Sequence, residues 1–296
     1  MAYSIEMLSL SKIGRLLKER LGDDASQYLF PDEFEQAVVD IGFCGVVIDG
    51  TSSPYDEIIF IGNGDSRLQR PGRTDFTSPF QKYKKATFIG TTEVPMCALW
   101  GQTELTDVVF NDGIVSIGYA AFQNCSSLDM NIVLPSSVVT IDQRAFMGTS
   151  ITSISAPGVT TLITSSGNGN STFYNCTSLK NVSFPKCVNY PGTGTGTAAR
   201  GIFANCTALE SVQLGSVGHG LPNPTGSTVS INANTFLNCT SAFTLTIYTD
   251  GGNVDALVTA ARSGATNATI VIKASADTTY GGTSYSAGAT IKTSTP

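Results

Sequence analysis

The sequence contains very little of what common enzyme sites are made from. Its 296 residues include a single histidine, His219, and charged side chains make up only 14% of the chain. A catalytic triad or a Cys-His pair would have to use that one histidine, and no Gly-x-Ser-x-Gly elbow is present. The seven cysteines are never spaced as Cys-x-x-Cys, which argues against a zinc site. We therefore predict a non-enzymatic protein with no catalytic residues, no metal and no cofactor.

Clustered positive charge and long apolar runs are also missing. The chain has 17 Lys and Arg against 23 Asp and Glu, for a net charge of -6, so no basic patch is expected to neutralise nucleic-acid phosphates. No stretch approaches the roughly 20 apolar residues that span a bilayer, and the start of the chain lacks the apolar core of a secretory signal. We expect a protein made in the cytoplasm, without membrane insertion and with reduced cysteines.

The residues that are abundant favour a β-rich fold. Apolar residues make up 41% of the chain, which allows a sizeable core. Gly, Ser, Thr and Asn are concentrated in the second half of the chain. Such a composition is typical of short strands joined by tight turns.

One phrase of seven to nine residues occurs six times along the middle of the chain. The copies are ALWGQTEL (98–105), AFQNCSSL (121–128), AFMGTSI (145–151), TFYNCTSL (172–179), IFANCTAL (202–209) and TFLNCTSAF (235–243). Each copy is followed by apolar residues at alternate positions, the pattern of a half-buried strand. The chain therefore contains a structural repeat.

The phrase resembles the unit of the BspA-like leucine-rich-repeat family, in which an apolar strand, a Gly- or Pro-marked turn and an Ile precede Ala-Phe-x-Asn-Cys-x-x-Leu. The stretch LTDVVFNDGIVSIGYAAFQNCSSL (105–128) carries every element. The resemblance covers about half of the chain. It implies a curved solenoid with one short parallel strand per coil.

Stacking such coils should align the repeated side chains in three ladders. The aromatic ladder, predicted to fill the core, is Phe122, Phe146, Phe173, Phe203 and Phe236. The amide ladder, predicted to satisfy backbone groups at the bend of each coil, is Asn124, Asn175, Asn205 and Asn238. The thiol ladder, predicted to consist of small buried apolar groups without disulfides, is Cys125, Cys176, Cys206 and Cys239.

The repeats grow longer along the chain, and the growth is confined to one half of the coil. From each ladder position to the last apolar residue of its strand the spacing stays between 10 and 12 residues, while the return to the next ladder position takes 12, 12, 17, 19 and 22. Insertions at one position of successive coils emerge on one side of a solenoid. Residues 157–171, 185–200 and 215–233 should therefore lie side by side.

We predict that these three segments form a recognition face for a host-surface protein or glycan. Their polar composition suits adaptable hydrogen bonding, and Tyr190 is the expected stacking residue. The other candidate binding residues are His219, Asn168, Asn170, Asn189, Arg200 and Asn223. The alternative is that the insertions are simply tolerated at the surface.

The first 42 residues predict a helical hairpin of a different kind. KIGRLLKERLG and FPDEFEQAVVDI place apolar residues on one face of each of two short helices. The hairpin resembles the helical module that opens many tail-fibre and virion-appendage proteins of phages infecting gut bacteria. Phe34 and Val38 depart mildly from that pattern. The resemblance implies attachment to other virion proteins and a homo-oligomer, whereas the alternative is a cap on the solenoid.

These observations divide the chain into four parts: an attachment module (1–42), a β-rich connecting region (43–85), the solenoid (86–250) and a C-terminal cap and tail (251–296). The cap should contain a helix over 253–262 and a strand over 269–273. The leading hypothesis is a virion or tail-appendage protein that recognises a host surface. The alternatives are a bacterial BspA-like adhesin or interaction scaffold at the cell surface, which would ordinarily need an export signal, and a glycan-processing enzyme, which would need a carboxylate pair in a cleft.

Overall fold

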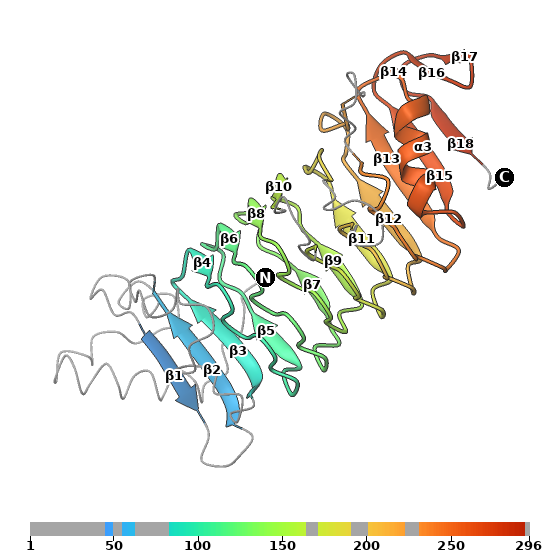
Figure 1. Cartoon of the computed structure of the whole chain (residues 1–296). Helices are drawn as coiled ribbons and strands as arrows, with labels where there is room; N and C mark the ends of the chain where they lie inside the picture. The colour runs from blue at the N-terminus through green and yellow to red at the C-terminus, as the bar shows by residue number, and fades with distance from the viewer. Residues whose placement is uncertain are drawn as a thin grey trace.

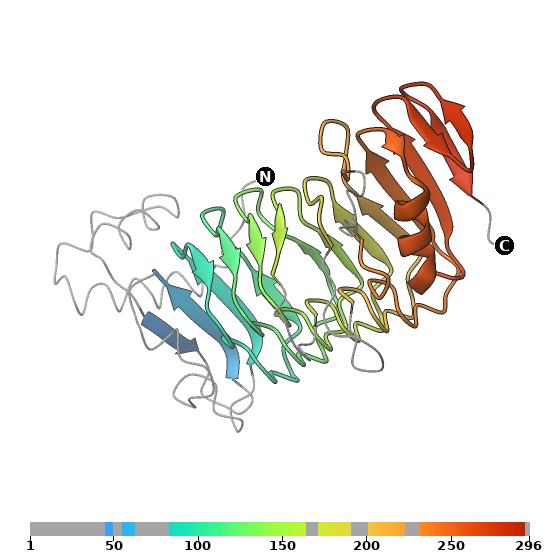
Figure 2. The same cartoon turned by 45° about the horizontal axis from the view of Figure 1, so that its top comes forward.

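The protein is an elongated stack of coils, seen from two sides in Figures 1 and 2. A computed structural model describes residues 45–49, 55–62, 83–163, 171–190, 201–222 and 231–293. The predicted helical hairpin over 1–42 lies outside these residues. Within them, the predicted β-rich solenoid with parallel strands is confirmed.

The strands of successive coils build two sheets that follow one another along the stack. The first sheet has the order β1 (Gly45–Asp49), β2 (Tyr55–Ile61), β3 (Tyr83–Ile89) and β5 (Asp107–Val109). The parallel pairing of β2 with β3 carries the coil pattern into the region before residue 86. The second sheet, called the long sheet here, runs through β7 (Asn131–Val133), β9 (Ser153–Ser155), β11 (Asn181–Phe184), β12 (Ser211–Leu214), β13 (Thr244–Thr249), β15 (Thr269–Ala274) and β18 (Thr290–Thr293).

Each of the early coils contributes a second, shorter strand that the sequence did not predict. These two-residue strands form the short sheet, β4 (Glu93–Val94), β6 (Ser116–Ile117), β8 (Thr140–Ile141) and β10 (Thr161–Leu162), all parallel. Figure 1 shows them in a row along one side of the stack. The second residue of each strand is buried and the first lies on the outer surface. The buried residues, together with Tyr190 and Ile231, which pair with each other in parallel, are called the inner positions.

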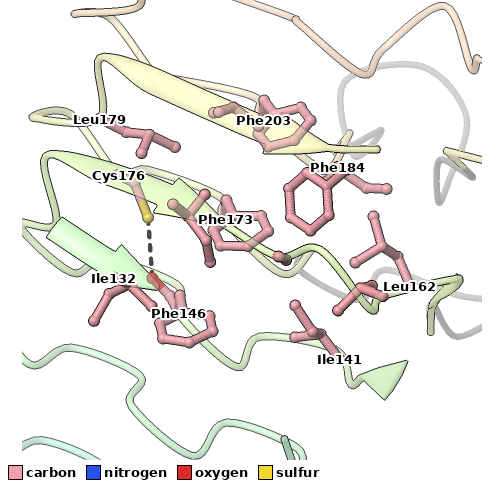
Figure 3. Close-up of a cluster of buried hydrophobic side chains, with 14 of the residues drawn as sticks. Ile132, Ile141, Phe146, Leu162, Phe173, Cys176, Leu179, Phe184 and Phe203 are labelled. Carbon is pink, nitrogen blue, oxygen red and sulfur yellow. Dashed lines mark hydrogen bonds between the residues drawn. The ribbon is translucent and has the colours of Figure 1, made fainter. Parts of the chain in front are cut away.

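The predicted aromatic ladder forms the centre of the core. Its five Phe side chains are completely buried. Successive rings stack with centroid separations of 5.1, 5.5, 5.5 and 5.5 Å, and Figure 3 shows Phe146, Phe173 and Phe203 one above the other. Leu99 holds the equivalent place in the first coil and is also fully buried. We call Leu99 and the five Phe residues the anchors.

The asparagines of the repeat act through their backbone conformation at the bend of each coil, and not through side-chain hydrogen bonds to backbone groups. The residue two places after each anchor has a positive φ, between 61° and 74°, and is always Asn or Gly: Gly101, Asn124, Gly148, Asn175, Asn205 and Asn238. These are the residue types that adopt this left-handed conformation at least cost. Among the described residues, the one hydrogen bond made by an amide of this ladder joins Asn238 to Asn205 at 2.9 Å. The predicted role of the amides in satisfying backbone groups is therefore wrong.

The thiol ladder is buried as predicted, and it also donates hydrogen bonds between coils. Each Sγ lies 3.0–3.2 Å from the carbonyl oxygen of the preceding coil's anchor: Cys125 to Leu99, Cys176 to Phe146, Cys206 to Phe173 and Cys239 to Phe203. Figure 3 marks the bond from Cys176. The six cysteines among the described residues are free thiols.

The C-terminal part closes the stack. Helix α3 (Asp255–Gly264) and β15 confirm the predicted helix and strand within two residues. The tail then adds β16 (Thr278–Tyr280) and β17 (Thr283–Tyr285), which join β14 (Gly252–Asn253) in a small sheet. Finally β18 pairs with β15 in the antiparallel direction. The direction of the long sheet is thereby reversed at its last strand.

Candidate recognition surface

The inserted segments leave the coil at two different places. In the short coils, the inner positions Val94, Ile117 and Ile141 each precede their anchor by five residues. The inner positions Leu162 and Tyr190 precede theirs by eleven and thirteen. The first two insertions therefore follow the short sheet, and the described chain returns from them at 171 and 201.

The third insertion comes earlier in its coil. Seventeen residues separate Leu214 at the end of β12 from the inner position Ile231, compared with six from Phe184 to Tyr190. Ile231 then precedes its anchor by the usual five residues. The prediction that all three segments emerge at one position is therefore wrong. The number of residues between the end of a strand and the next anchor shows that a coil is longer, but it does not show where between them the extra residues lie.

The insertions leave the core unchanged. Ring separations along the aromatic ladder are 5.5 Å across the lengthened coils, close to the 5.1 Å of the preceding short coil. The backbone can approach very closely where the chain returns: a Cβ on Gly201 would lie 1.8 Å from the Asn234 carbonyl oxygen. The lengthened segments are thus carried by a constant frame, an arrangement typical of binding loops on a rigid scaffold.

Tyr190 does not lie on the surface, which corrects its predicted role as a stacking residue. It is fully buried at an inner position, and its hydroxyl donates to the Cys187 carbonyl at 2.9 Å. Burial also raises the pKa of the Tyr190 hydroxyl well above its ordinary value. The Asn and Pro on either side of it favoured a loop. Its spacing of six residues after Phe184, however, is close to the six or seven residues that separate Ile117, Ile141 and Leu162 from the last apolar residue of the preceding strand.

Two other predicted binding residues are exposed at the edges of the insertions. Asn189 lies next to Tyr190, and His219 closes a tight turn with Ser216 through backbone hydrogen bonds of 3.0 and 3.1 Å. The tip of that turn is Val217, whose side chain is 81% exposed. Asn168, Asn170, Arg200 and Asn223 lie outside the described residues.

Five of the six described cysteines are buried thiols with a raised pKa. Burial raises the pKa of Cys125 and Cys239 to about 12 and that of Cys176 and Cys187 to about 11, and it raises the pKa of Cys206 as well. A thiol reacts as its thiolate. These side chains are therefore packing groups rather than catalytic ones.

A groove on the outer face of the short sheet was missed by the sequence reasoning. It has a volume of about 400 Å³ and is lined by Glu93, Met96, Ser116, Ile117, Gly118, Tyr119, Thr140, Asp142 and Ile163. These residues come from four successive coils and lie close together only because the coils stack. The one signal in the sequence was Gly118, which stands where the next coils carry Asp142 and Ile163.

Among the described residues, no helix combines the length and the apolar character needed to cross a membrane. In the same part of the chain, no cluster of three or more His, Cys, Asp or Glu side chains is arranged to hold a metal ion.

Comparison with known proteins finds a family model that is similar to part of the repeat region. Residues 92–217 match the profile described as "BspA type Leucine rich repeat region", in six copies. A search of curated proteins found no match. A leucine-rich-repeat protein from Bacteroides ovatus is similar over 70% of this chain, with 14% identity and a TM-score of 0.40, and this chain covers 65% of that protein. One from Eubacterium ventriosum is similar over 71% of this chain and 87% of its own length, with 11% identity and a TM-score of 0.25.

Proposed function

Taking residues 92–217 as a BspA-type leucine-rich-repeat region, we propose that this protein is a non-enzymatic recognition protein that binds a surface glycan or protein. The observation that carries the proposal is the combination of lengthened segments with an unchanged aromatic ladder. Because each coil contacts mainly its neighbours, segments can lengthen without cost to the core. The raised pKa values of the buried thiols support a role other than catalysis.

We further propose that the protein is part of a phage virion, where it presents the solenoid to the host cell. The resemblance of residues 1–42 to the helical module of phage tail and appendage proteins supports this placement. The two helices that the sequence predicts for residues 1–42 would need a partner for their apolar faces, either another virion protein or a second copy of this chain. A bacterial cell-surface adhesin or scaffold is the second candidate, which the repeat family supports equally well.

Removal of residues 1–42 distinguishes an attachment module from a folding cap. We expect the shortened protein to keep a cooperative unfolding transition and to be absent from purified particles, whereas the full chain is detected in them by mass spectrometry. If the full chain is found instead on the bacterial envelope and never in particles, the protein is a bacterial cell-surface adhesin or scaffold. Loss of cooperative unfolding on truncation would show that the segment is a cap.

Shortening the lengthened coils tests the recognition face. Removing 164–169 and 191–198 restores the five-residue spacing between inner position and anchor in both coils. The short coils have a positive φ two residues before the anchor, at Cys97, Ala120 and Arg144. The first deletion should therefore include Ser171→Gly, which supplies that conformation at low cost.

We expect the shortened protein to retain its far-UV circular dichroism and to lose binding to bacterial cells and to purified envelope glycans. A matched control carries Ser171→Gly alone and should bind like the unmodified protein. Undiminished binding by the shortened, folded protein would move recognition to another surface of the solenoid.

A further inference from the structure

The groove over the short sheet owes its shape to one missing side chain. Gly118, Asp142 and Ile163 each follow the inner residue of their strand and donate a backbone hydrogen bond to the preceding coil. A Cβ on Gly118 would lie 2.7 Å from the Met96 nitrogen and from the Val94 oxygen, so close coil packing requires glycine there. The row of side chains is therefore interrupted at Gly118, which forms the floor of the groove.

Two hydroxyl groups that line the groove, those of Ser116 and Thr140, have no hydrogen-bond partner within the described part of the chain. Elsewhere small hydroxyls bond to the backbone of a preceding coil, as Ser150 does to Ser126 at 2.6 Å and Ser241 does to Leu209 at 2.7 Å. In the groove, by contrast, Ser116 and Thr140 stand opposite each other on paired strands with no such bond among the described residues. Donors and acceptors are thus left available to a ligand.

The acidic side of the groove is positioned by the backbone. One carboxylate oxygen of Asp142 accepts a hydrogen bond from the Gln143 N–H at 2.5 Å, which fixes the orientation of the group. Its second oxygen has no partner among the described residues. Glu93 contributes another carboxylate to the lining. Two carboxylates in one groove favour a ligand that donates hydrogen bonds and disfavour a negatively charged one.

Tyr119 supplies an aromatic surface to the same groove. Its side chain is half-buried and lines the groove, and the Arg144 guanidinium lies 5.5 Å from the ring centroid. The cation–π contact holds the ring in place before a ligand arrives, which lowers the ordering cost of binding. Met96 and Ile163 add apolar walls.

We propose that this groove binds one neutral sugar ring of a glycan. An aromatic ring matches the apolar face of a pyranose, while hydroxyl and carboxylate oxygens match its hydroxyl groups. The volume of about 400 Å³ lies in the range of small-molecule sites. The inference rests on the proposed function, because it names a ligand class for the recognition protein. The groove also adjoins the lengthened coils, since Ile163 is the last described residue before the first insertion.

Binding of simple sugars to the full chain tests the proposal. The panel consists of methyl glucoside, methyl galactoside, methyl mannoside and N-acetylglucosamine, with glucuronate and N-acetylneuraminate as acidic members. By ligand-observed NMR titration we expect saturable binding of at least one neutral sugar, with a Kd on the order of millimolar. The acidic sugars should not bind. Absence of saturation for every neutral sugar up to about 50 mM, or equal binding of the acidic ones, would overturn the proposal.

Two variants assign the binding to the groove. Tyr119→Ala should weaken binding about tenfold through loss of the aromatic surface, and Asp142→Asn should weaken it while leaving the ring in place. Tyr119→Phe keeps the ring and serves where the alanine variant fails to fold. Tyr174→Ala, another half-buried tyrosine that does not line the groove, is the matched control and should bind normally. Unchanged affinity in the folded Tyr119 and Asp142 variants refutes the assignment.

The protein with shortened coils separates this proposal from the proposed function. If that protein still binds the monosaccharide but not cells, both proposals stand. If it binds cells as well as the full chain does, the lengthened coils are not the recognition face, whereas the groove is judged by the Tyr119 and Asp142 variants alone.

Discussion

Raising the pH should unfold this protein through its buried thiols. The pKa of Cys125 is raised by burial from 9.0 to about 12, so the folded state keeps the proton that the unfolded chain loses. Stability from such a group is fully present below pH 9 and is lost as the pH rises toward 12. At pH 10 the unfolded thiol is mostly ionised, which lowers the free energy of unfolding by about 1.4 kcal/mol per thiol.

Five thiols act in the same direction. The pKa of Cys239 is also raised to about 12, those of Cys176 and Cys187 to about 11, and that of Cys206 is raised as well. At pH 10 the four thiols whose pKa is raised to about 11 or 12 together lower the free energy of unfolding by roughly 6 kcal/mol, comparable with the whole stability of an ordinary domain. With a urea m-value of about 3 kcal/mol/M, the unfolding midpoint should fall by roughly 2 M between pH 7.5 and pH 10.

The assay is urea unfolding followed by circular dichroism in the presence of a reductant. Cys125→Ala removes one titrating group and should reduce the slope of stability against pH, between pH 9.5 and 10.5, by about 1 kcal/mol per pH unit. The two proteins are otherwise identical in sequence, so the difference between their slopes belongs to the thiol. Identical pH slopes in the two proteins would refute the reasoning.

Three further substitutions probe the ladders, each measured as a change in the free energy of unfolding. Phe173→Ala, in the middle of the aromatic ladder, should lower the free energy of unfolding by about 3–5 kcal/mol because of the cavity that it leaves. A loss smaller than that caused by a surface substitution would show that the stacked rings do not form the core. Cys176→Ser should cost about 1–3 kcal/mol, because the shorter C–O bond draws the buried donor away from the Phe146 carbonyl. Asn175→Ala should cost about 1 kcal/mol because of its φ of 62°, whereas Asn175→Gly should be nearly neutral; equal effects would exclude backbone conformation as the cause.

The ladders could be predicted because repetition encodes them directly. A residue that recurs once per coil must stack on its copies, so Phe122 to Phe236 and the buried cysteines followed from spacing alone. The left-handed corner was also written in the sequence, since only Gly and Asn occupy 101, 124, 148, 175, 205 and 238. That pattern points to backbone conformation, and an interpretation based on side-chain hydrogen bonds overlooked it.

The candidate binding surface was harder to predict because it depends on differences between coils. The buried position of Tyr190 follows from its distance in sequence to the preceding strand, whereas the residues next to it are typical of a loop. The groove around Gly118 is an opposite case: Tyr119, Asp142 and Ile163 belong to three coils, and none of them is unusual within its own repeat. Only the stacking distance brings these side chains together.

The reversed strand at the end of the long sheet governs how this molecule can change in length. The chain direction reverses at β18, and among the described residues the stack of rings and the chain of thiol-to-carbonyl bonds end before it, at Phe243 and Cys239. An insertion or deletion that preserves the stacked rings and the thiol-to-carbonyl bonds must therefore lie within the stack of coils. It must add or remove a whole repeat, such as the 23 residues from Leu99 to Phe122. Variants of this gene should therefore differ by complete internal duplications or excisions, and each would shift the groove and the lengthened coils apart or together by one strand spacing, about 5 Å.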